Sequence, residues 1–113
     1  MRKTTIQFTI ELDENNIPDK IQWDASDKPD HAPSDAKSIS IAIWDQVQKN
    51  TLRIDLWTKD MPVDEMKRFY IDCLGGLGQS ILTSTGDEFM ASETHALCDR
   101  LIAHIRNQNS AKE

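Results

Sequence analysis

The sequence has few cysteines, no long apolar run and no excess of basic residues, and each shortage argues against a class of protein. Its two cysteines, Cys73 and Cys98, do not form a Cys-x-x-Cys pair. No stretch has the length and hydrophobicity of a membrane span. The formal net charge of −6 argues against a nucleic-acid partner, because binding to phosphates normally needs a concentrated lysine and arginine face.

The composition predicts one folded domain. The 113 residues are 38% hydrophobic and 28% charged, which is too apolar for a disordered chain. A chain of this length can bury its apolar side chains around a single core. Because Met1-Arg2-Lys3-Thr4 passes directly into an alternating pattern, we expect neither a secretory signal nor membrane insertion. We expect a cytoplasmic protein whose thiols stay reduced.

Sequence motifs of catalysis and phosphate binding are also missing. The chain contains no Gly-x-Ser-x-Gly elbow and no His-Glu-x-x-His motif. The glycines at 75, 76 and 78 lack the preceding strand and the following Gly-Lys-Ser/Thr of a phosphate loop. We interpret them as a close backbone contact or a local helix break. We therefore expect a protein that is not an enzyme and that needs no cofactor.

Two sets of potential metal ligands are interpreted as surface residues. Carboxylate and amide groups with spacing that suggests calcium follow the first apolar run: Asp13, Asn15 and Asp19. However, Ile17 stands at a ligand position of a calcium loop and Pro18 replaces its glycine, so a solvated turn is favoured. The histidines are too far apart to share a metal at helical spacing and should be surface residues: His31, His95 and His104. We expect no metal.

Four segments alternate between apolar and polar residues, which predicts half-buried β-strands. They span about residues 4–12, 19–25, 37–45 and 51–58. Polar residues between the first two and between the last two suit the turns of two hairpins. Residues 26–37 contain two prolines and no periodicity, so we expect the longest exposed connection there. Because each strand has only one apolar face, the pattern favours an antiparallel sheet.

Apolar stripes with helical spacing follow the strands. They predict a helix over about residues 62–85, with Pro62 in its first turn and Gly86 marking its end. A second helix is predicted over about 92–106, and residues 107–113 should be disordered. The expected fold class is α+β, a two-layer sandwich. Both helices should pack on one face of a single four-stranded antiparallel sheet.

The other face of this sheet is the candidate for partner binding. Parity places two tryptophans there with an arginine and an aspartate: Trp44, Arg53, Asp55 and Trp57. Depending on the hairpin register, Trp44 should oppose Arg53 or Asp55. Tryptophan and arginine are enriched at interface hot spots, which favours a protein-binding surface. The alternatives are that each ring packs only on its own neighbours, or that this face forms a homodimer.

Four separated segments resemble one known family. They are FTIELDENNIP at 8–18, WDASDKP at 23–29, ISIAIWD at 39–45 and NTLRIDLWTKDMPVDEMKRFYIDCLGGL at 50–77, which resemble the gliding motility-associated protein GldC. The resemblance covers nearly the whole chain. It implies a small cytoplasmic accessory protein of bacterial gliding, and it transfers no catalytic or ligand residues.

Together with the predicted sheet face, this resemblance suggests an adaptor or chaperone-like helper. Its protein partner should belong to the gliding machinery. The alternative is a small-molecule-binding or enzymatic domain, with a ligand between sheet and helices near Cys73 and the glycines.

Overall fold

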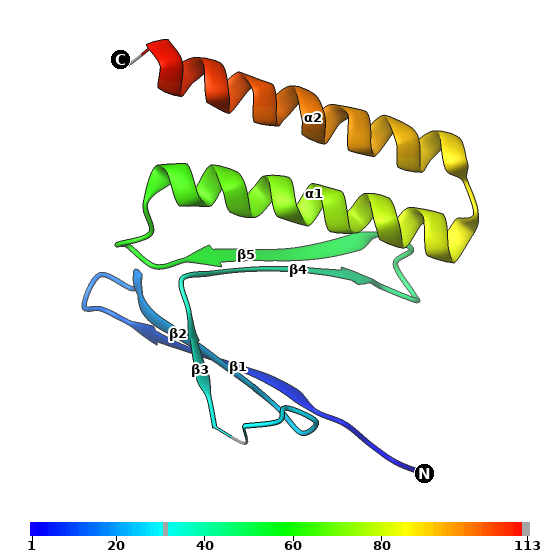
Figure 1. The fold of residues 1–113 in the computed structure, drawn as a ribbon. Coiled ribbons are helices and arrows are strands. Elements are labelled where there is room, and N and C mark those ends of the chain that lie inside the picture. Colours follow the sequence, from blue (N-terminus) through cyan, green and yellow to red (C-terminus); the bar gives the residue numbers. More distant parts are fainter. Residues whose placement is uncertain (31, 112–113) are drawn as a thin grey trace. The chain divides into compact units, whose positions relative to one another are not determined.

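Five strands are followed by two helices in the structure, a computed structural model that describes residues 1–30 and 32–111. The elements are β1 (Ile6–Leu12), β2 (Pro18–Ala25), β3 (Ser34–Ala36), β4 (Ser38–Trp44), β5 (Thr51–Trp57), α1 (Val63–Thr85) and α2 (Glu88–Ala111) (Figure 1). The strands form two antiparallel sheets, one with the order β1-β2-β3 and one made of β4 and β5. The α+β class is thus confirmed, but the prediction of a single four-stranded sheet is wrong.

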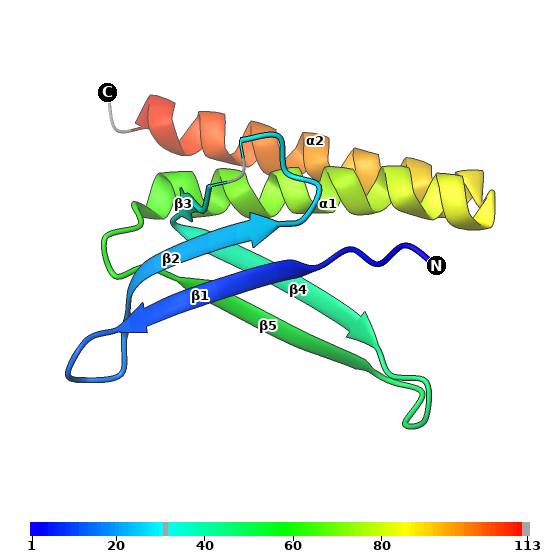
Figure 2. The same ribbon diagram turned by 90° about the horizontal axis from the view of Figure 1, so that it is seen from below.

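The β1–β2 hairpin has one apolar and one polar face. Phe8 opposes Trp23 and Ile10 opposes Ile21, so the apolar residues of both strands share a face, as alternation predicts. Ile21 is fully buried. Figure 2 shows β1 and β2 side by side along their length.

Most described residues of the segment between β2 and β4 are exposed, as predicted for residues 26–37, but the segment is not an irregular connection throughout. Ser34–Ala36 forms β3, which pairs with β2. Lys28 is only 7% exposed, and its Nζ donates hydrogen bonds to the carbonyl of Ala32 and to Oγ of Ser34. The same ammonium lies 4.9 Å from the ring centroid of Trp23. Alternation could not reveal β3, because three residues are too few to show a period.

The chain changes sheets at Lys37, the single residue between β3 and β4. β3 pairs with β2, whereas β4 pairs with β5. The amide of Thr58 donates to the carbonyl of Lys37 at 2.8 Å and closes the β4–β5 ladder at this end. Alternation within a strand does not specify which strand lies beside it, so the sequence pattern could not separate one sheet from two.

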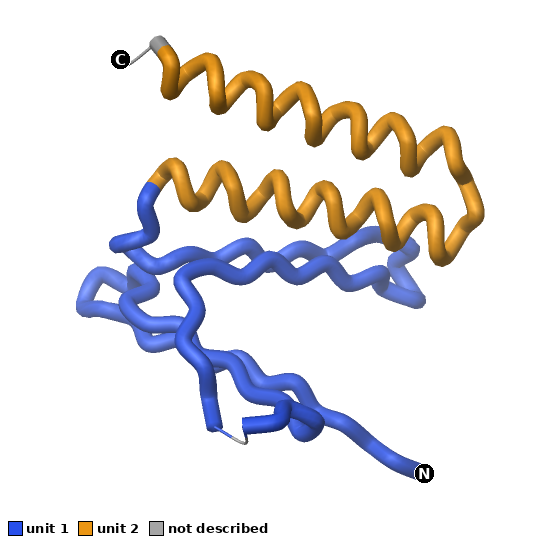
Figure 3. Tube along the Cα trace, viewed as in Figure 1, with its two compact units in different colours: residues 1–62 blue, residues 63–113 orange. Residues whose placement is uncertain are grey.

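The chain divides into two units, residues 1–62 and residues 63–113 (Figure 3). The first holds the five strands and the second holds the two helices. The expected packing of both helices on one sheet face stays a prediction, as does the expected single domain.

α1 runs without interruption through its three glycines, so the local break considered from the sequence does not occur. The close-contact interpretation applies to Gly78, which is buried against α2. A Cβ atom at Gly78 would come within 2.7 Å of Nε2 of His95. At Gly75 and Gly76 a Cβ atom would meet nothing within 4 Å.

A short connection caps both helices. α1 ends at Thr85, and Gly86 follows with φ of +72°, its amide donating to the carbonyl of Leu82 at 2.9 Å. This is the left-handed C-terminal cap expected of glycine. Asp87 then caps α2, because its Oδ1 accepts a hydrogen bond from the amide of Met90 at 2.9 Å.

The bounds of α2 differ from the predicted ones at both ends. The helix begins at Glu88 rather than near residue 92, because Asp87 supplies the cap and not Ser92. It continues to Ala111, so the prediction of disorder is wrong over residues 107–111. Gln108 is held by a hydrogen bond from Nζ of Lys67, 3.2 Å away on α1. His31 and the last two residues lie outside the described part of the chain. Within that part, neither helix has the length and hydrophobicity needed to cross a membrane.

Candidate protein-binding face

The β4–β5 hairpin brings the four predicted partner-binding residues onto one face. Its register opposes Ser38 to Trp57, Ser40 to Asp55, Ala42 to Arg53 and Trp44 to Thr51. Directly opposed residues of an antiparallel pair lie on the same side of the sheet. These four residues form what we call the hairpin face: Trp44, Arg53, Asp55 and Trp57. The opposite side carries Ile39, Ile41, Ile43, Leu52, Ile54 and Leu56.

The register differs from both sequence alternatives, since Trp44 opposes Thr51 and neither Arg53 nor Asp55. The connection between the strands sets this register. The amide of Asp45 donates to the carbonyl of Asn50 at 2.9 Å. Arg53 follows Thr51 by two residues and is therefore the diagonal neighbour of Trp44, a position that long side chains can reach.

Arg53 and Asp55 form an ion pair at the centre of the hairpin face. Nη2 and Nε of Arg53 donate to the two carboxylate oxygens of Asp55 at 2.9 and 3.2 Å. Ser40, directly across the ladder, donates from Oγ to Oδ1 of Asp55 at 2.7 Å. Nη2 of Arg53 also lies 2.9 Å from Oγ of Ser40. Such bidentate pairing fixes the orientation of both side chains.

The pKa of Asp55 is lowered by these contacts. The hydrogen bond from Ser40 is the largest cause and the hydrogen bond from Arg53 is the second, while partial desolvation acts in the opposite direction. Asp55 is therefore ionised at neutral pH. A carboxylate with a lowered pKa is a poor general base near pH 7.

The two indoles flank this ion pair and are exposed. Trp44 has 64% of its surface exposed and Trp57 has 49%. Trp57 opposes Ser38, at the other end of β4 from Trp44. At the rise of an extended strand the two rings are attached about 20 Å apart. The hairpin face thus presents two aromatic groups with a fixed charged pair between them.

A shallow depression of about 210 Å³ adjoins the Trp57 end of the hairpin face. It is lined by residues at and just after the end of β5 and at and just before the start of β2: Ile17, Pro18, Asp55, Leu56, Trp57 and Lys59. The sequence analysis did not include Ile17, Pro18 or Lys59 in the site. The fold places them there, because the amide of Lys59 donates to the carbonyl of Pro18 at 3.1 Å. The sequence signal that could have pointed to this depression is Ile17, an apolar residue in an otherwise polar turn.

Lys59 also fixes the turn beside this depression. Its Nζ lies 3.2 Å from Oδ2 of Asp13 and 3.4 Å from Oδ1 of Asp19. These hydrogen bonds raise the pKa of Lys59. Asp13 accepts the amides of Ile17 and Asn15 as well, and the bond from Ile17 is the largest cause of its lowered pKa. The carboxylate of Asp13 is thus occupied within the turn.

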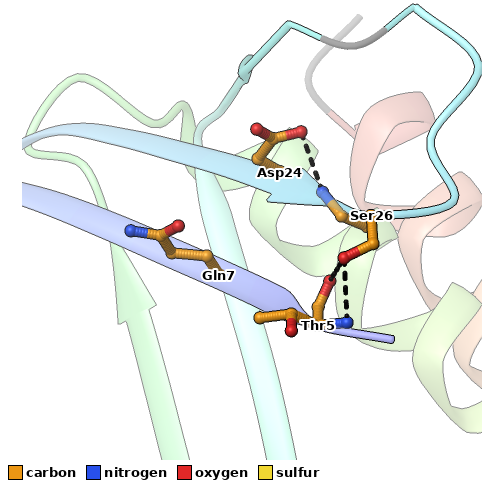
Figure 4. Close-up of a pocket in the computed structure, with 5 residues that line it drawn as sticks. Thr5, Gln7, Asp24 and Ser26 are labelled. Atoms are coloured by element: carbon orange, nitrogen blue, oxygen red, sulfur yellow. Dashed lines mark hydrogen bonds between the residues drawn. The ribbon is translucent and has the colours of Figure 1, made fainter. Parts of the chain in front are cut away.

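A second depression, of about 160 Å³, lies on the polar side of the β1–β2 hairpin (Figure 4). Its lining is Thr5, Gln7, Asp24, Ala25 and Ser26. Oγ of Ser26 accepts the amide of Thr5 at 3.1 Å, and Oδ1 of Asp24 accepts the amide of Ala25 at 2.9 Å. Because these groups bond to one another, few are left to orient a ligand.

A third hollow, of about 300 Å³, lies between α1 and α2. Its lining is mainly apolar, with one lysine and one histidine: Lys67, Tyr70, Ile71, Leu74, Leu101, His104 and Ile105. This groove does not include Cys73 or the glycines, near which the alternative ligand site was predicted. That alternative site involves both units and stays a prediction.

Comparisons with known proteins identify a family. The family model described as gliding motility-associated protein GldC-like matches residues 18–107. Searches of curated proteins and of solved structures give no match. The matched segment includes the whole hairpin face.

Proposed function

Because the chain belongs to the gliding motility-associated protein GldC-like family, we propose that it is a non-enzymatic accessory protein of bacterial gliding that binds another protein of that machinery. In this proposal it works in the cytoplasm as an adaptor or chaperone-like helper. The partner docks on the hairpin face, with Trp44 and Trp57 as its aromatic anchors.

The observation that carries the proposal is the arrangement of two exposed indoles around a preformed ion pair. Exposing an indole to water is unfavourable, and most of that cost is recovered when a partner covers the ring. The Arg53–Asp55 pair is already oriented, so a partner that binds it orders few side chains on this protein. Aromatic and arginine side chains held in this way are the usual composition of interface hot spots.

The depression beside Trp57 suggests which end of the face binds more tightly. A side chain of the partner placed there would contact Ile17 and the indole together. We therefore expect the Trp57 end to contribute more of the binding energy than the Trp44 end.

The test is a capture experiment with matched variants of the immobilised chain. Trp44→Ala, Trp57→Ala and the double variant are exposed to extract of a gliding host, and the captured proteins are quantified by mass spectrometry. Leu52→Ala is the control, because Leu52 is 52% exposed on the opposite side of the same hairpin. Circular dichroism verifies that every variant is folded.

The expected result is a loss of captured motility proteins of at least tenfold in the double variant, with the larger single effect at Trp57. Leu52→Ala should capture as much as the native chain. Equal capture by the native chain and the double variant would show that the hairpin face is not the docking site. Capture of metabolic enzymes alone would remove the gliding partner from the proposal.

A second candidate function is small-molecule binding in the groove between α1 and α2. Its volume of about 300 Å³ lies at the lower end of the range of ligand sites, and its lining is mainly apolar. A thermal-shift screen of metabolites tests this function, since a ligand that binds only the native state raises the melting temperature. Leu74→Asp should abolish any shift that arises in this groove.

A further inference from the structure

β1 is the edge strand of the three-stranded sheet, and half of its backbone groups point away from β2. The amide of Ser26 donates to the carbonyl of Thr5, and the amide of Asp13 donates to the carbonyl of Ile17, both at 2.9 Å. Odd-numbered residues of β1 therefore direct their N–H and C=O groups at β2. By the alternation of an antiparallel ladder, the even-numbered residues direct theirs outward. In the described part of the chain, no strand pairs with β1 along that outer edge.

Over most of its length this edge lacks the usual protection against pairing with another chain. Between Ile6 and Ile10 the strand contains no proline, no lysine and no bulge, and the shift in register comes only at Glu11 and Leu12. Its apolar side chains are exposed at both ends, Ile6 at 64% and Leu12 at 53%. A seven-residue strand of this kind is a ready template for β-sheet extension.

We propose that a second copy of this chain pairs with the edge, its β1 antiparallel to the first and a two-fold axis passing through Thr9. In this register Ile6 opposes Leu12 of the second copy, and Phe8 opposes Ile10. These are the residues whose backbone groups point outward, so the new ladder uses the unpaired donors and acceptors. The dimer then contains one six-stranded antiparallel sheet, made of β1, β2 and β3 from each copy. The apolar faces of the two β1–β2 hairpins are continuous across the axis.

Only this register pairs all seven residues of β1 with all seven of the second copy. Shifting the axis to Phe8 or Ile10 keeps apolar residues opposite each other but leaves two residues of each strand unpaired. The central register also opposes Gln7 to Glu11, so no two like charges face each other.

The charges that flank β1 favour the same arrangement. Lys3 precedes the strand and Glu14 follows it, whereas Arg2 already pairs with Asp27 and Asp13 with Lys59. Antiparallel pairing brings the basic end of each strand to the acidic end of the other, and the two-fold axis repeats this attraction. The interface is separate from the hairpin face, whose residues lie on β4 and β5.

The first test measures the dissociation constant of the dimer by sedimentation equilibrium on the intact chain. Thr9→Glu places two carboxylates opposite each other at the axis and should raise the dissociation constant about tenfold at low salt, less at high salt. Thr9→Gln is the matched control and should leave it unchanged. A chain that stays monomeric at all concentrations overturns the proposal, as does a dimer that Thr9→Glu does not weaken.

The second test is disulfide formation under mild oxidation. Thr9→Cys should link two chains, because residue 9 opposes itself at a close pair of the ladder. Gln7→Cys points to the same side but lies about 14 Å from its own copy, four residues along the strands, and should not link. Mass spectrometry identifies the peptide joined through position 9, which excludes products of Cys73 and Cys98. Equal linking of both variants, or of neither, overturns the register.

Discussion

Gly78 on α1 lies directly against His95 on α2, so close that an added Cβ atom would come within 2.7 Å of Nε2 and 2.8 Å of Cδ2 of the imidazole. Cγ2 of Thr94 would lie at 3.3 Å. The glycine therefore allows α2 to approach the backbone of α1 at this point. Gly76, two residues away on the same helix, has open space in the direction of a Cβ atom.

This difference predicts that alanine substitutions at Gly76 and Gly78 change the free energy of unfolding by different amounts. Gly76→Ala should raise the free energy of unfolding by about 1 kcal/mol, because alanine is the better helix former and meets nothing. Gly78→Ala should raise it by less or lower it, because the ring of His95 and the methyl group of Thr94 must move. Urea unfolding of both variants measures the two changes.

A double-mutant cycle identifies the cause. In the His95→Ala background the imidazole is absent, so Gly78→Ala should become nearly as stabilising as Gly76→Ala. If Gly78→Ala and Gly76→Ala are equally stabilising in the native chain, the contact with His95 has no energetic consequence.

The contacts of Lys28 lead to a prediction about the stability of the segment before β3. Its buried ammonium contacts Ala32, Ser34 and, at 3.0 Å, Oδ1 of Asp30, and so holds the segment that leads into β3. Lys28→Met keeps most of the side-chain volume but leaves these acceptors without their donor. The free energy of unfolding should fall by about 1–3 kcal/mol, and the amides of β3 should lose protection from hydrogen exchange.

Lys20→Met is the control for that experiment, because Lys20 is an exposed lysine of β2 and should change stability by about 0.5 kcal/mol or less. If Lys28→Met is no more destabilising than Lys20→Met, the contacts of Lys28 do not hold β3 in place.

Much of the fold was predictable from periodicity alone. Alternation in segments such as Ile6–Leu12 marks strands because side chains on successive residues point to opposite faces. The start of α1 and its end at Gly86 were predictable for the same kind of local reason. β3 and the change of sheet at Lys37 were not, because both depend on which strand lies alongside, and periodicity within a segment does not indicate its neighbour.

The candidate site was likewise predictable only in part. Parity placed Trp44, Arg53, Asp55 and Trp57 on one face because a strand has a period of two. The register was not predictable, since it depends on the connection at 45–50, where Lys49 adopts a positive φ of 57°. The depression beside Trp57 requires Ile17, a residue some forty positions away along the chain, and only tertiary structure brings it there.

Substitutions at Gly86 test how backbone strain alone, without a steric clash, affects stability. Its φ of +72° is unfavourable for residues with a Cβ atom, while nothing lies within 4 Å of that position. Gly86→Ala should therefore lower the free energy of unfolding by about 1 kcal/mol through backbone strain alone. Gly86→Asn should cost less, because asparagine tolerates the left-handed region. Equal losses for alanine and asparagine, measured in urea, would point to a cause other than backbone conformation.

The charged groups predict how stability depends on pH. The pKa values of Asp13, Asp55 and Asp60 are lowered in the folded chain, mainly by hydrogen bonds from the amide of Ile17, from Ser40 and from Thr58 respectively. Their contribution is complete above the ordinary aspartate value of about 3.9 and is lost as pH falls through the lowered values. The pKa of Lys59 is raised by Asp13 and Asp19, so its contribution is complete below about 10.4 and is lost as pH rises through the raised value.

Lys59→Gln should change the pH dependence of stability on both the alkaline and the acid side. It removes the group responsible for the alkaline loss and one of the causes that lower the pKa of Asp13, so the urea midpoint should fall less steeply both above pH 10 and below pH 4. Ser40→Ala should flatten only the acid side, through Asp55. Lys20→Gln is the control for the loss of one positive charge, and an alkaline slope equal in Lys59→Gln and Lys20→Gln would show that the contacts of Lys59 with Asp13 and Asp19 are not its source.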